Sequence, residues 1–132
     1  MKKKFSIKWK SSRQIRKQRK YRYNAPLHIK RKFFSANLSK ELRKKYSRRS
    51  FGLHKGDVVR IMRGGFAGKK GKITGIDAAN LRVYIEGVQK AKKDGTKINI
   101  AFNPTKLQII ELNMDDKKRI QSLERKTKGE KK

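Results

Sequence analysis

The apolar residues of this chain concentrate in one stretch, where they alternate with polar residues as in β-strands. Residues 51–112 hold 26 of the 45 apolar residues, in short runs rich in Val and Ile. Gly, Asp, Asn and Pro interrupt these runs about every ten residues. Val59 with Ile61, and Val83 with Ile85, are spaced by two and therefore face one side of a strand. The pattern predicts strands near residues 57–63, 71–77, 82–87, 97–102 and 107–112.

The residues between these strands are those that favour turns. Residues 77–80 separate the second strand from the third, the sequence AKKDG precedes the fourth, and Asn103-Pro104 ends the fourth. Five short strands joined in this way are typical of a small, mainly β, SH3-like barrel. Gly64, Gly65, Gly68 and Gly71 lie between the first two strands, in the sequence RGGFAGKKGK, and turns alone do not explain them.

Charge divides the chain into three parts. The 40 Lys and Arg residues outnumber the 10 Asp and Glu residues, for a net charge of +30. Residues 1–50 carry +19, residues 51–112 carry +7, and residues 113–132 carry +4. We therefore predict a basic N-terminal arm, a β domain with the only hydrophobic core, and a basic C-terminal helix and tail. A charge this large needs a polyanion, because neutralisation by phosphate offsets the self-repulsion.

Short helices are expected within the arm. Ser12 is placed to cap a helix over residues 13–22, which has no apolar face, so we expect that helix to order against RNA. Pro26 suits the first turn of a second short helix. Ser39 opens a third, with Glu41 in its first turn, as the helix dipole favours. Leu38, Leu42 and Tyr46 would lay this third helix on the domain.

Several functional classes are excluded or disfavoured. The chain has no Cys, so disulfides and thiolate zinc sites are excluded. No apolar run has membrane-spanning length, and no signal peptide or lipidation motif follows Met1. The glycine-rich sequence does not match a phosphate-binding loop, and the few acidic residues are scattered, so we predict no enzyme, no cofactor and no small-molecule substrate. We also expect no homo-oligomer.

The sequence KGDVVRIMRGGFAGKKGKITGID resembles a KOW motif, in which a glycine-rich basic loop joins two strands. KOW motifs occur in ribosomal proteins and in transcription elongation factors, so the motif implies an RNA-associated barrel. An RNA-binding module of a transcription elongation factor is therefore the alternative interpretation. Such a factor usually joins a separate α/β domain to the barrel and does not need a +19 arm.

The flanking sequences resemble one ribosomal family over nearly the whole chain. RKQRK, YNAPLHIKRKFFSANLSKELRKKYSRRS, RVYIEGV, FNPTK and DDKKRIQSLERK occur in the order seen in the archaeal and eukaryotic large-subunit protein numbered twenty-four in bacteria and twenty-six in eukaryotes. Ala67 and His54 depart from the Lys and Arg usual there. The fuller arm points away from bacteria, and the short C-terminus favours an archaeal source.

The resemblance implies a structural constituent of the large ribosomal subunit in the cytoplasm. It implies binding to the 5′ region of the large-subunit rRNA near the polypeptide tunnel exit, beside neighbouring ribosomal proteins, and a part in subunit assembly. The predicted RNA-binding residues are basic, aromatic or glycine: Trp9, Arg13, Arg16, Lys17, Arg19, Lys20, Tyr21, Arg22, His28, Lys30, Arg31, Lys32, Arg43, Arg48, Arg49, Lys55, Arg63, Gly64, Phe66, Gly68, Lys69, Lys70, Lys72 and Lys106.

Each class of candidate has a plainer alternative. The basic arm is also compatible with a nuclear-localisation signal or solvated disorder. Aromatic residues among basic ones stack on unpaired bases; we expect this of Trp9, for which the sequence offers no partner, whereas Tyr23 and Phe66 have protein packing as an alternative. Hairpin geometry alone is an alternative for the loop glycines, and it is the better explanation of Gly71, at a strand start. For Gly64 and Gly68 we expect close approach of the backbone to RNA.

The remaining polar candidates have surface or structural interpretations. His28 and His54 have no nearby carboxylate, so surface or phosphate contacts are expected of them rather than metal binding. Asp115 and Asp116 are expected to be first-turn helix acids, not a metal pair.

Overall fold

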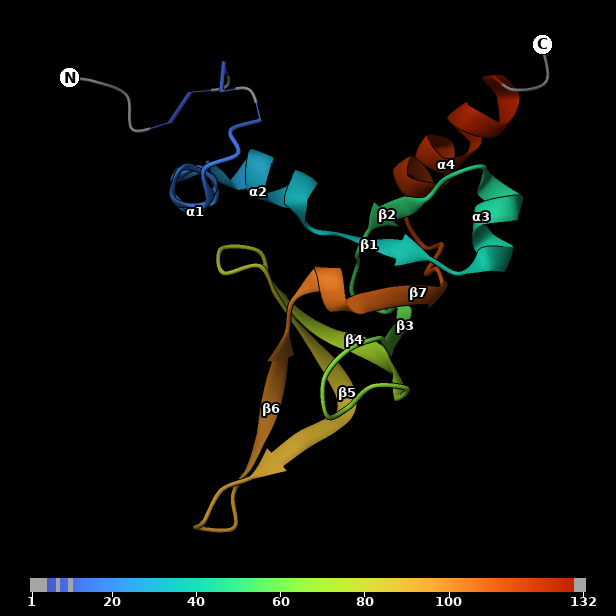
Figure 1. Cartoon of the computed structure of the whole chain (residues 1–132). Helices are drawn as coiled ribbons and strands as arrows, with labels where there is room; N and C mark the ends of the chain where they lie inside the picture. The colour runs from blue at the N-terminus through green and yellow to red at the C-terminus, as the bar shows by residue number, and fades with distance from the viewer. Residues whose placement is uncertain (1–4, 7, 10, 130–132) are drawn as a thin grey trace.

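The protein is a seven-stranded β-sheet flanked by helices at both chain ends (Figure 1). The computed structural model describes residues 5–129 except 7 and 10, so residues 1–4, 7, 10 and 130–132 of the predicted arm and tail lie outside the described residues. The strands are β1 (Ser35–Leu38), β2 (Ser50–Gly52), β3 (Val58–Ile61), β4 (Lys70–Asp77), β5 (Arg82–Ala91), β6 (Lys97–Phe102) and β7 (Leu107–Glu111).

The strand order β2-β1-β7-β3-β4-β5-β6 makes a sheet that is not closed, with β2 and β6 at its ends. Five of the six pairs between described strands are antiparallel, and β1 pairs with β7 in parallel. The predicted fold class, mainly β and barrel-like with a partly helical basic N-terminus and a C-terminal helix, is confirmed. All five predicted strands are present. Two further strands, β1 within the predicted arm and β2 across its boundary at residue 50, bring the number to seven.

The hydrophobic core lies within the sheet and draws on more of the chain than the apolar pattern predicted. Alternate residues of the central strands, such as Val59 and Ile61, are fully buried, as period-two spacing requires. Phe34, Ala36 and Leu38 are buried in the same cluster. The prediction that a core forms only within residues 51–112 was therefore wrong, because β1 pairs with β7 and places these side chains against the others.

The helices begin close to the predicted positions, but of the two serines expected at helix starts only Ser39 is an N-cap. The Ser39 hydroxyl accepts a hydrogen bond from the Leu42 amide, which confirms it as an N-cap. Ser12 does not cap the first helix: that helix follows Gln14, which makes no side-chain cap, and the Ser12 hydroxyl instead accepts from the Gln14 amide. Pro26 is the N-cap of the second helix. The helices are α1 (Ile15–Asn24), α2 (Leu27–Phe33), α3 (Lys40–Tyr46), α4 (Lys117–Gly129) and the short 3-10 helix η1 (Pro104–Lys106).

Helix α4 is joined to the sheet by a buried ion pair. The Arg119 guanidinium lies 2.7 Å from the Asp57 carboxylate, and it also donates to the backbone carbonyl of Asn113. The prediction that Asp115 and Asp116 lie in the first turn was wrong, because α4 begins at Lys117 and both precede it. The Asp116 carboxylate accepts a hydrogen bond from the Lys118 amide. The acid therefore satisfies a free N–H at the start of the helix, where a negative charge is favoured.

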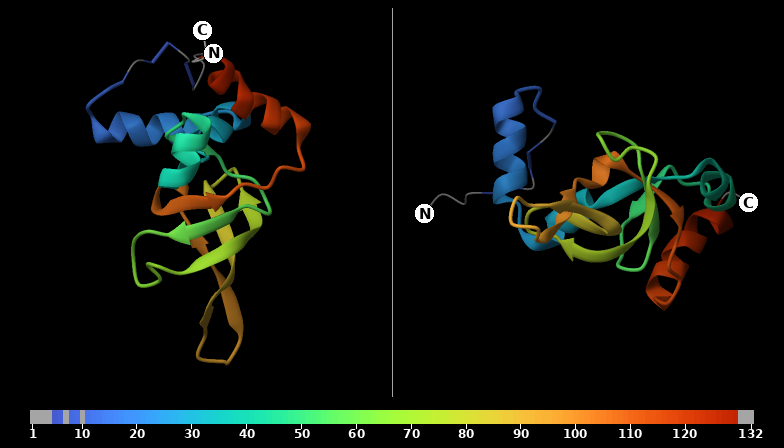
Figure 2. Two further views of the ribbon diagram at one scale, coloured as in Figure 1. Left: turned by 90° about the vertical axis from the view of Figure 1, so that its right-hand side faces the viewer. Right: turned by 90° about the horizontal axis from the view of Figure 1, so that it is seen from below.

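The two ends of the molecule and the β5–β6 hairpin extend away from the central strands. α1 lies at one end and α4 at the other, and the hairpin projects from the sheet (Figures 1 and 2).

Two exposed turns are closed by carboxylates. The pKa of Asp77 is lowered chiefly by a hydrogen bond from the Asn80 side chain, and that of Asp94 by the Thr96 hydroxyl. Both carboxylates therefore favour the charged form, which is the form that accepts these bonds.

Candidate nucleic-acid interface

Helix α1 is strongly basic. It contains no acidic residue and buries none of its side chains, as expected for a helix without an apolar face. Tyr21 is half-buried and packs against Phe33 of α2, so the prediction that α1 cannot be held by its own protein was wrong. The cations of the helix match the charge of an RNA backbone. The exposed cations on α1 and directly before it are Arg13, Arg16, Lys17, Arg19, Lys20 and Arg22.

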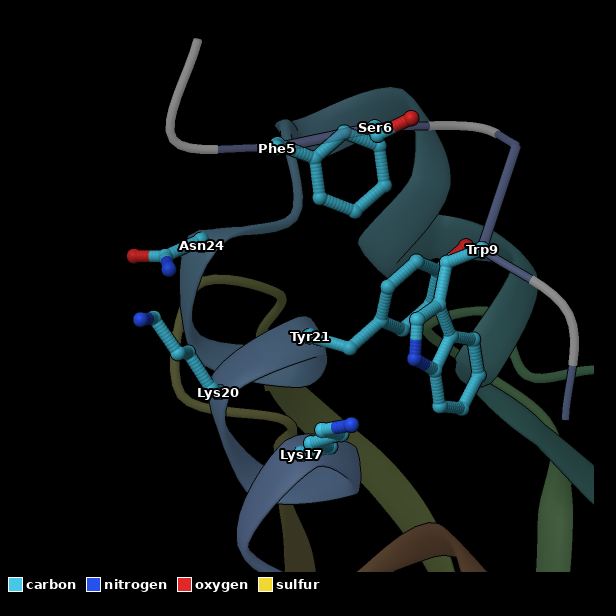
Figure 3. A pocket seen from close by; sticks show the side chains of 7 residues that line it. All are labelled: Phe5, Ser6, Trp9, Lys17, Lys20, Tyr21 and Asn24. Carbon is cyan, nitrogen blue, oxygen red and sulfur yellow. The ribbon is translucent and has the colours of Figure 1, made fainter. Parts of the chain in front are cut away.

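The aromatic residues beside α1 form a cluster. The rings of Trp9 and Tyr21 stack with their centroids 4.5 Å apart, so the expectation that Trp9 lacks a partner within the chain was wrong (Figure 3). The ring centroid of Phe5 lies 4.8 Å from that of Tyr21, and the ring centroid of Phe33, in α2, lies 5.9 Å from it. Tyr23 points away from the cluster's packing, since 81% of its surface is exposed. The cluster attaches the segment before α1 to the two N-terminal helices.

Helix α2, which lies between α1 and strand β1 in the chain, is also basic. His28, Arg31 and Lys32 are exposed, whereas Lys30 is half-buried and donates a hydrogen bond of 3.1 Å to the Ala79 carbonyl. Ala79 lies in the turn between β4 and β5. This contact places the arm beside that turn, although the two segments are far apart in the sequence.

The glycine-rich loop joins β3 to β4 in a compact turn. Gly64 and Gly68 have φ values of 95° and 89°, a region that favours glycine, so their presence has a conformational reason. The Gly68 amide donates to the Ile61 carbonyl at 2.8 Å, which closes the loop on β3. A Cβ at Gly64, Gly65 or Gly68 would meet no described atom within 4 Å. The loop surface is therefore open to close approach by another molecule.

Two other loop residues serve the fold. A Cβ on Gly71 would lie 2.7 Å from the Glu86 carbonyl oxygen, so the structural interpretation of this glycine is confirmed. Phe66 is half-buried and its ring meets that of Phe102 edge-on, with the centroids 6.2 Å apart. Of the two interpretations of Phe66, packing over the core is the one present, and Lys69 places its ammonium group 5.3 Å from the ring centroid.

Basic side chains from three segments meet around a hollow beside the loop. Its volume is about 220 Å³, and Arg63 of the loop, Arg82 at the start of β5 and Lys106 of η1 line it, together with Gly64 and Phe66. Arg82 was not among the predicted RNA-binding residues. Its position before buried Val83 shows from sequence that it faces outward, but only the sheet pairing brings it to Arg63 and Lys106.

A second basic hollow lies beside the first half of β4. Lys55 and Lys72 line it with Gly56, Thr74 and Asn113, and both lysines are exposed. Lys69 and Lys70 are also exposed, and in the sequence they lie between Phe66 of the first hollow and Lys72 of the second. The predicted basic residues of the domain thus gather around the loop and strand β4, and they are separate from the surface of α1.

Besides Lys69, which lies over the Phe66 ring, three of the predicted basic residues hydrogen-bond to backbone carbonyls of the protein. Arg43 donates from Nε to the Leu38 carbonyl at 2.8 Å. Arg48 donates to the Ser122 carbonyl of α4, and its guanidinium lies 5.5 Å from the centre of the Phe51 ring. Lys30 is the third, through its bond to the β4–β5 turn. Their roles in the fold are therefore established, whereas Arg49 and His54 are exposed.

The described part of the chain offers neither a membrane-crossing helix nor a cluster of metal ligands. Among the described residues, no helix has both the length and the apolar character needed to cross a bilayer. The same residues include no group of three or more His, Cys, Asp or Glu side chains able to bind a metal ion. Asp115 and Asp116 instead adjoin the start of α4.

Comparison with known proteins identifies the family. Residues 12–126 match the model described as ribosomal proteins L26 eukaryotic, L24p archaeal. Two similar relatives are named "Large ribosomal subunit protein uL24". The one from Methanosphaera stadtmanae is 44% identical over 87% of this chain and 98% of its own length. The one from Methanoregula boonei is 41% identical over 85% of this chain and 93% of its own length. The chain therefore belongs to this family of ribosomal proteins, and it is a structural, non-enzymatic component of cytoplasmic ribosomes.

Proposed function

We propose that this chain is a structural constituent of the large ribosomal subunit that binds large-subunit rRNA through two separate basic surfaces. The first is the arm, with the exposed cations of α1 and α2. The second is the loop surface, which consists of Arg63, Lys69, Lys70, Arg82 and Lys106. The single observation that carries the proposal is that exposed cations gather on both surfaces, with no acidic residue in α1 and none lining the hollow beside Arg63, Arg82 and Lys106.

The mode of contact follows from the kind of residue on each surface. Lys and Arg bind phosphate oxygens without reading sequence, and they fix the position of a protein on folded RNA. An open glycine-rich turn allows a backbone to approach closely. We infer that the protein recognises the shape and phosphates of rRNA, as expected where the grooves of A-form RNA display little readable sequence.

The site on the subunit is inferred from the family resemblance. We propose that the chain binds the 5′ region of the large-subunit rRNA near the polypeptide tunnel exit, that neighbouring ribosomal proteins contact it there, and that it assists subunit assembly. The net charge of +30 supports a part in assembly, because a chain of this charge is stabilised when phosphates neutralise it. A module of a transcription elongation factor is not favoured, since the family match spans residues 12–126, the arm included.

Fractionation of a native lysate on a density gradient tests the proposal. Large subunits are washed in high salt, and the chain is then located by immunoblot. Retention on the washed subunits is expected, because many dispersed phosphate contacts within folded RNA resist screening better than a docked module does. Release into the wash, or migration with RNA polymerase, would contradict it. Chemical footprinting of the retained complexes would then locate the rRNA region that the chain protects.

A further inference from the structure

We propose that the aromatic cluster beside α1 is a binding pocket for one unpaired RNA base. This inference rests on the proposed rRNA binding and adds a specific ligand to the arm. The pocket is a hollow of about 230 Å³ lined by Phe5, Ser6, Trp9, Lys17, Lys20, Tyr21 and Asn24 (Figure 3). It is smaller than the roughly 300–1,000 Å³ typical of sites for drug-sized ligands, which suits a single planar ring system.

The walls of the pocket are aromatic rings held in place by one another. Trp9 stacks on Tyr21 with an interplanar angle of 21°, and Phe5 meets the same ring at 36°. Tyr21 is held on its helix by Phe33 of α2, so the rings of three separate segments fix the cluster. The three rings are half-buried and line the hollow, so part of each remains accessible. A preformed group of rings binds a base at low entropic cost, because every base has a flat π-face.

The polar groups of the pocket match a nucleotide. Lys17 and Lys20 line it, and Arg16 and Arg19 lie on the same helix, so a phosphate on either side of the base meets cations. Asn24 also lines the pocket, and its amide points away from the aromatic rings (Figure 3). Among the described residues, no acidic side chain lines the pocket. This charge complementarity favours RNA over a segment of a neighbouring protein.

The experiment uses the single tryptophan of the chain as its reporter. The full chain is titrated with a short single-stranded RNA of mixed sequence and with an abasic ribose-phosphate oligomer of the same length and charge. We expect the RNA to quench Trp9 fluorescence and to bind roughly 5- to 100-fold more tightly than the abasic oligomer. The RNA advantage should fall on Tyr21→Leu and persist on Tyr23→Leu, since Tyr23 lies on the same helix and is exposed.

The outcomes separate this inference from the function on which it rests. Equal binding of both oligomers, with the same salt dependence, would overturn the base pocket and leave phosphate binding by the arm intact. If neither oligomer binds, the base pocket and phosphate binding by the arm are both overturned. The comparison of oligomers on the unmodified chain does not depend on how a variant folds. Ultraviolet cross-linking of purified large subunits gives a second test: Trp9 or Tyr21 joined to a nucleotide supports the pocket, and joined to a protein peptide overturns it.

Discussion

Arg119 of α4 and Asp57 before β3 form a buried ion pair with two parallel hydrogen bonds of 2.7 Å. The second guanidinium nitrogen also reaches the Gly52 carbonyl, and Asp57 accepts backbone N–H bonds from His54 and Asn113. Both side chains are almost completely buried. The pair therefore connects the C-terminal helix, the end of β2 and the start of β3 through one hydrogen-bonded centre.

Replacing Arg119 with Met is expected to destabilise the protein strongly. The substitution leaves the Asp57 carboxylate buried without its cation, and removal of one partner of a buried pair costs about 3–5 kcal/mol. The measurement is the free energy of unfolding of the full chain in urea. Arg125→Met, an exposed position on the same helix, is the control and should change it by less than ~0.5 kcal/mol. An effect of Arg119→Met as small as that of the control would contradict the role given to the pair.

The strands of the domain could be predicted from the sequence, whereas β1 and the Asp57–Arg119 pair could not. Strand periodicity predicted the five strands of the domain, because alternation follows from local geometry. β1 was missed because its four residues, SANL, are too short to show a period and their strand partner β7 lies about seventy positions away, at Asn37↔Gln108. Asp57 and Arg119 are separated by 62 positions, and no local pattern predicts that they meet.

The basic segments of the candidate interface could be predicted from the sequence, whereas the contacts between distant segments could not. Charge density along the chain marked the basic arm and loop, since each Lys or Arg on an exposed helix or loop faces solvent unless it finds a partner. Neither the Trp9–Tyr21 stack nor the approach of Arg82 to Arg63 could be predicted, because each depends on how distant segments pack. The RNA-binding roles of these residues stay predictions.

Gly71 and Gly65 are expected to respond differently to the same substitution. An alanine Cβ at Gly71 would lie 2.7 Å from the Glu86 carbonyl oxygen and from a methyl group of Ile85, so β4 and β5 must move apart. Overpacking of this kind costs about 1–3 kcal/mol. Gly65 has open space around it and no positive φ, so Gly65→Ala should have little effect. Thermal unfolding of both variants measures the difference; equal melting temperatures would show that the strands relax without cost.

Removal of residues 1–22 is expected to weaken RNA binding and to flatten its salt dependence while the sheet stays folded. The deleted segment holds 11 basic residues and no acidic residue, and the core cluster begins at Phe34. Every phosphate that the shortened chain no longer neutralises lowers the slope of log K against log salt by about 0.7–0.9. Titrations of large-subunit rRNA fragments at several salt concentrations measure this slope.

A charge-preserving variant serves as the control for the deletion. Trp9→Leu combined with Tyr21→Leu keeps every cation of the arm, so its salt slope should match that of the unmodified chain even where its affinity falls. A deletion that leaves the slope unchanged would exclude the arm from phosphate binding. A deletion that unfolds the sheet would show instead that the arm contributes to stability.

Neutralising Arg63 and Arg82 together is expected to weaken RNA binding uniformly across sequences. Both side chains are exposed and line the hollow beside the glycine-rich loop, so Arg63→Gln with Arg82→Gln should leave the stability unchanged. If each binds one phosphate, the salt slope falls by about 1.5 in total. Lys92→Gln with Lys93→Gln is the matched control, because these exposed lysines lie at the tip of the β5–β6 hairpin. Equal effects of the two double variants would mean that only total charge matters and that the loop surface is not a defined site; a larger effect at Arg63 and Arg82 would locate the second RNA contact there.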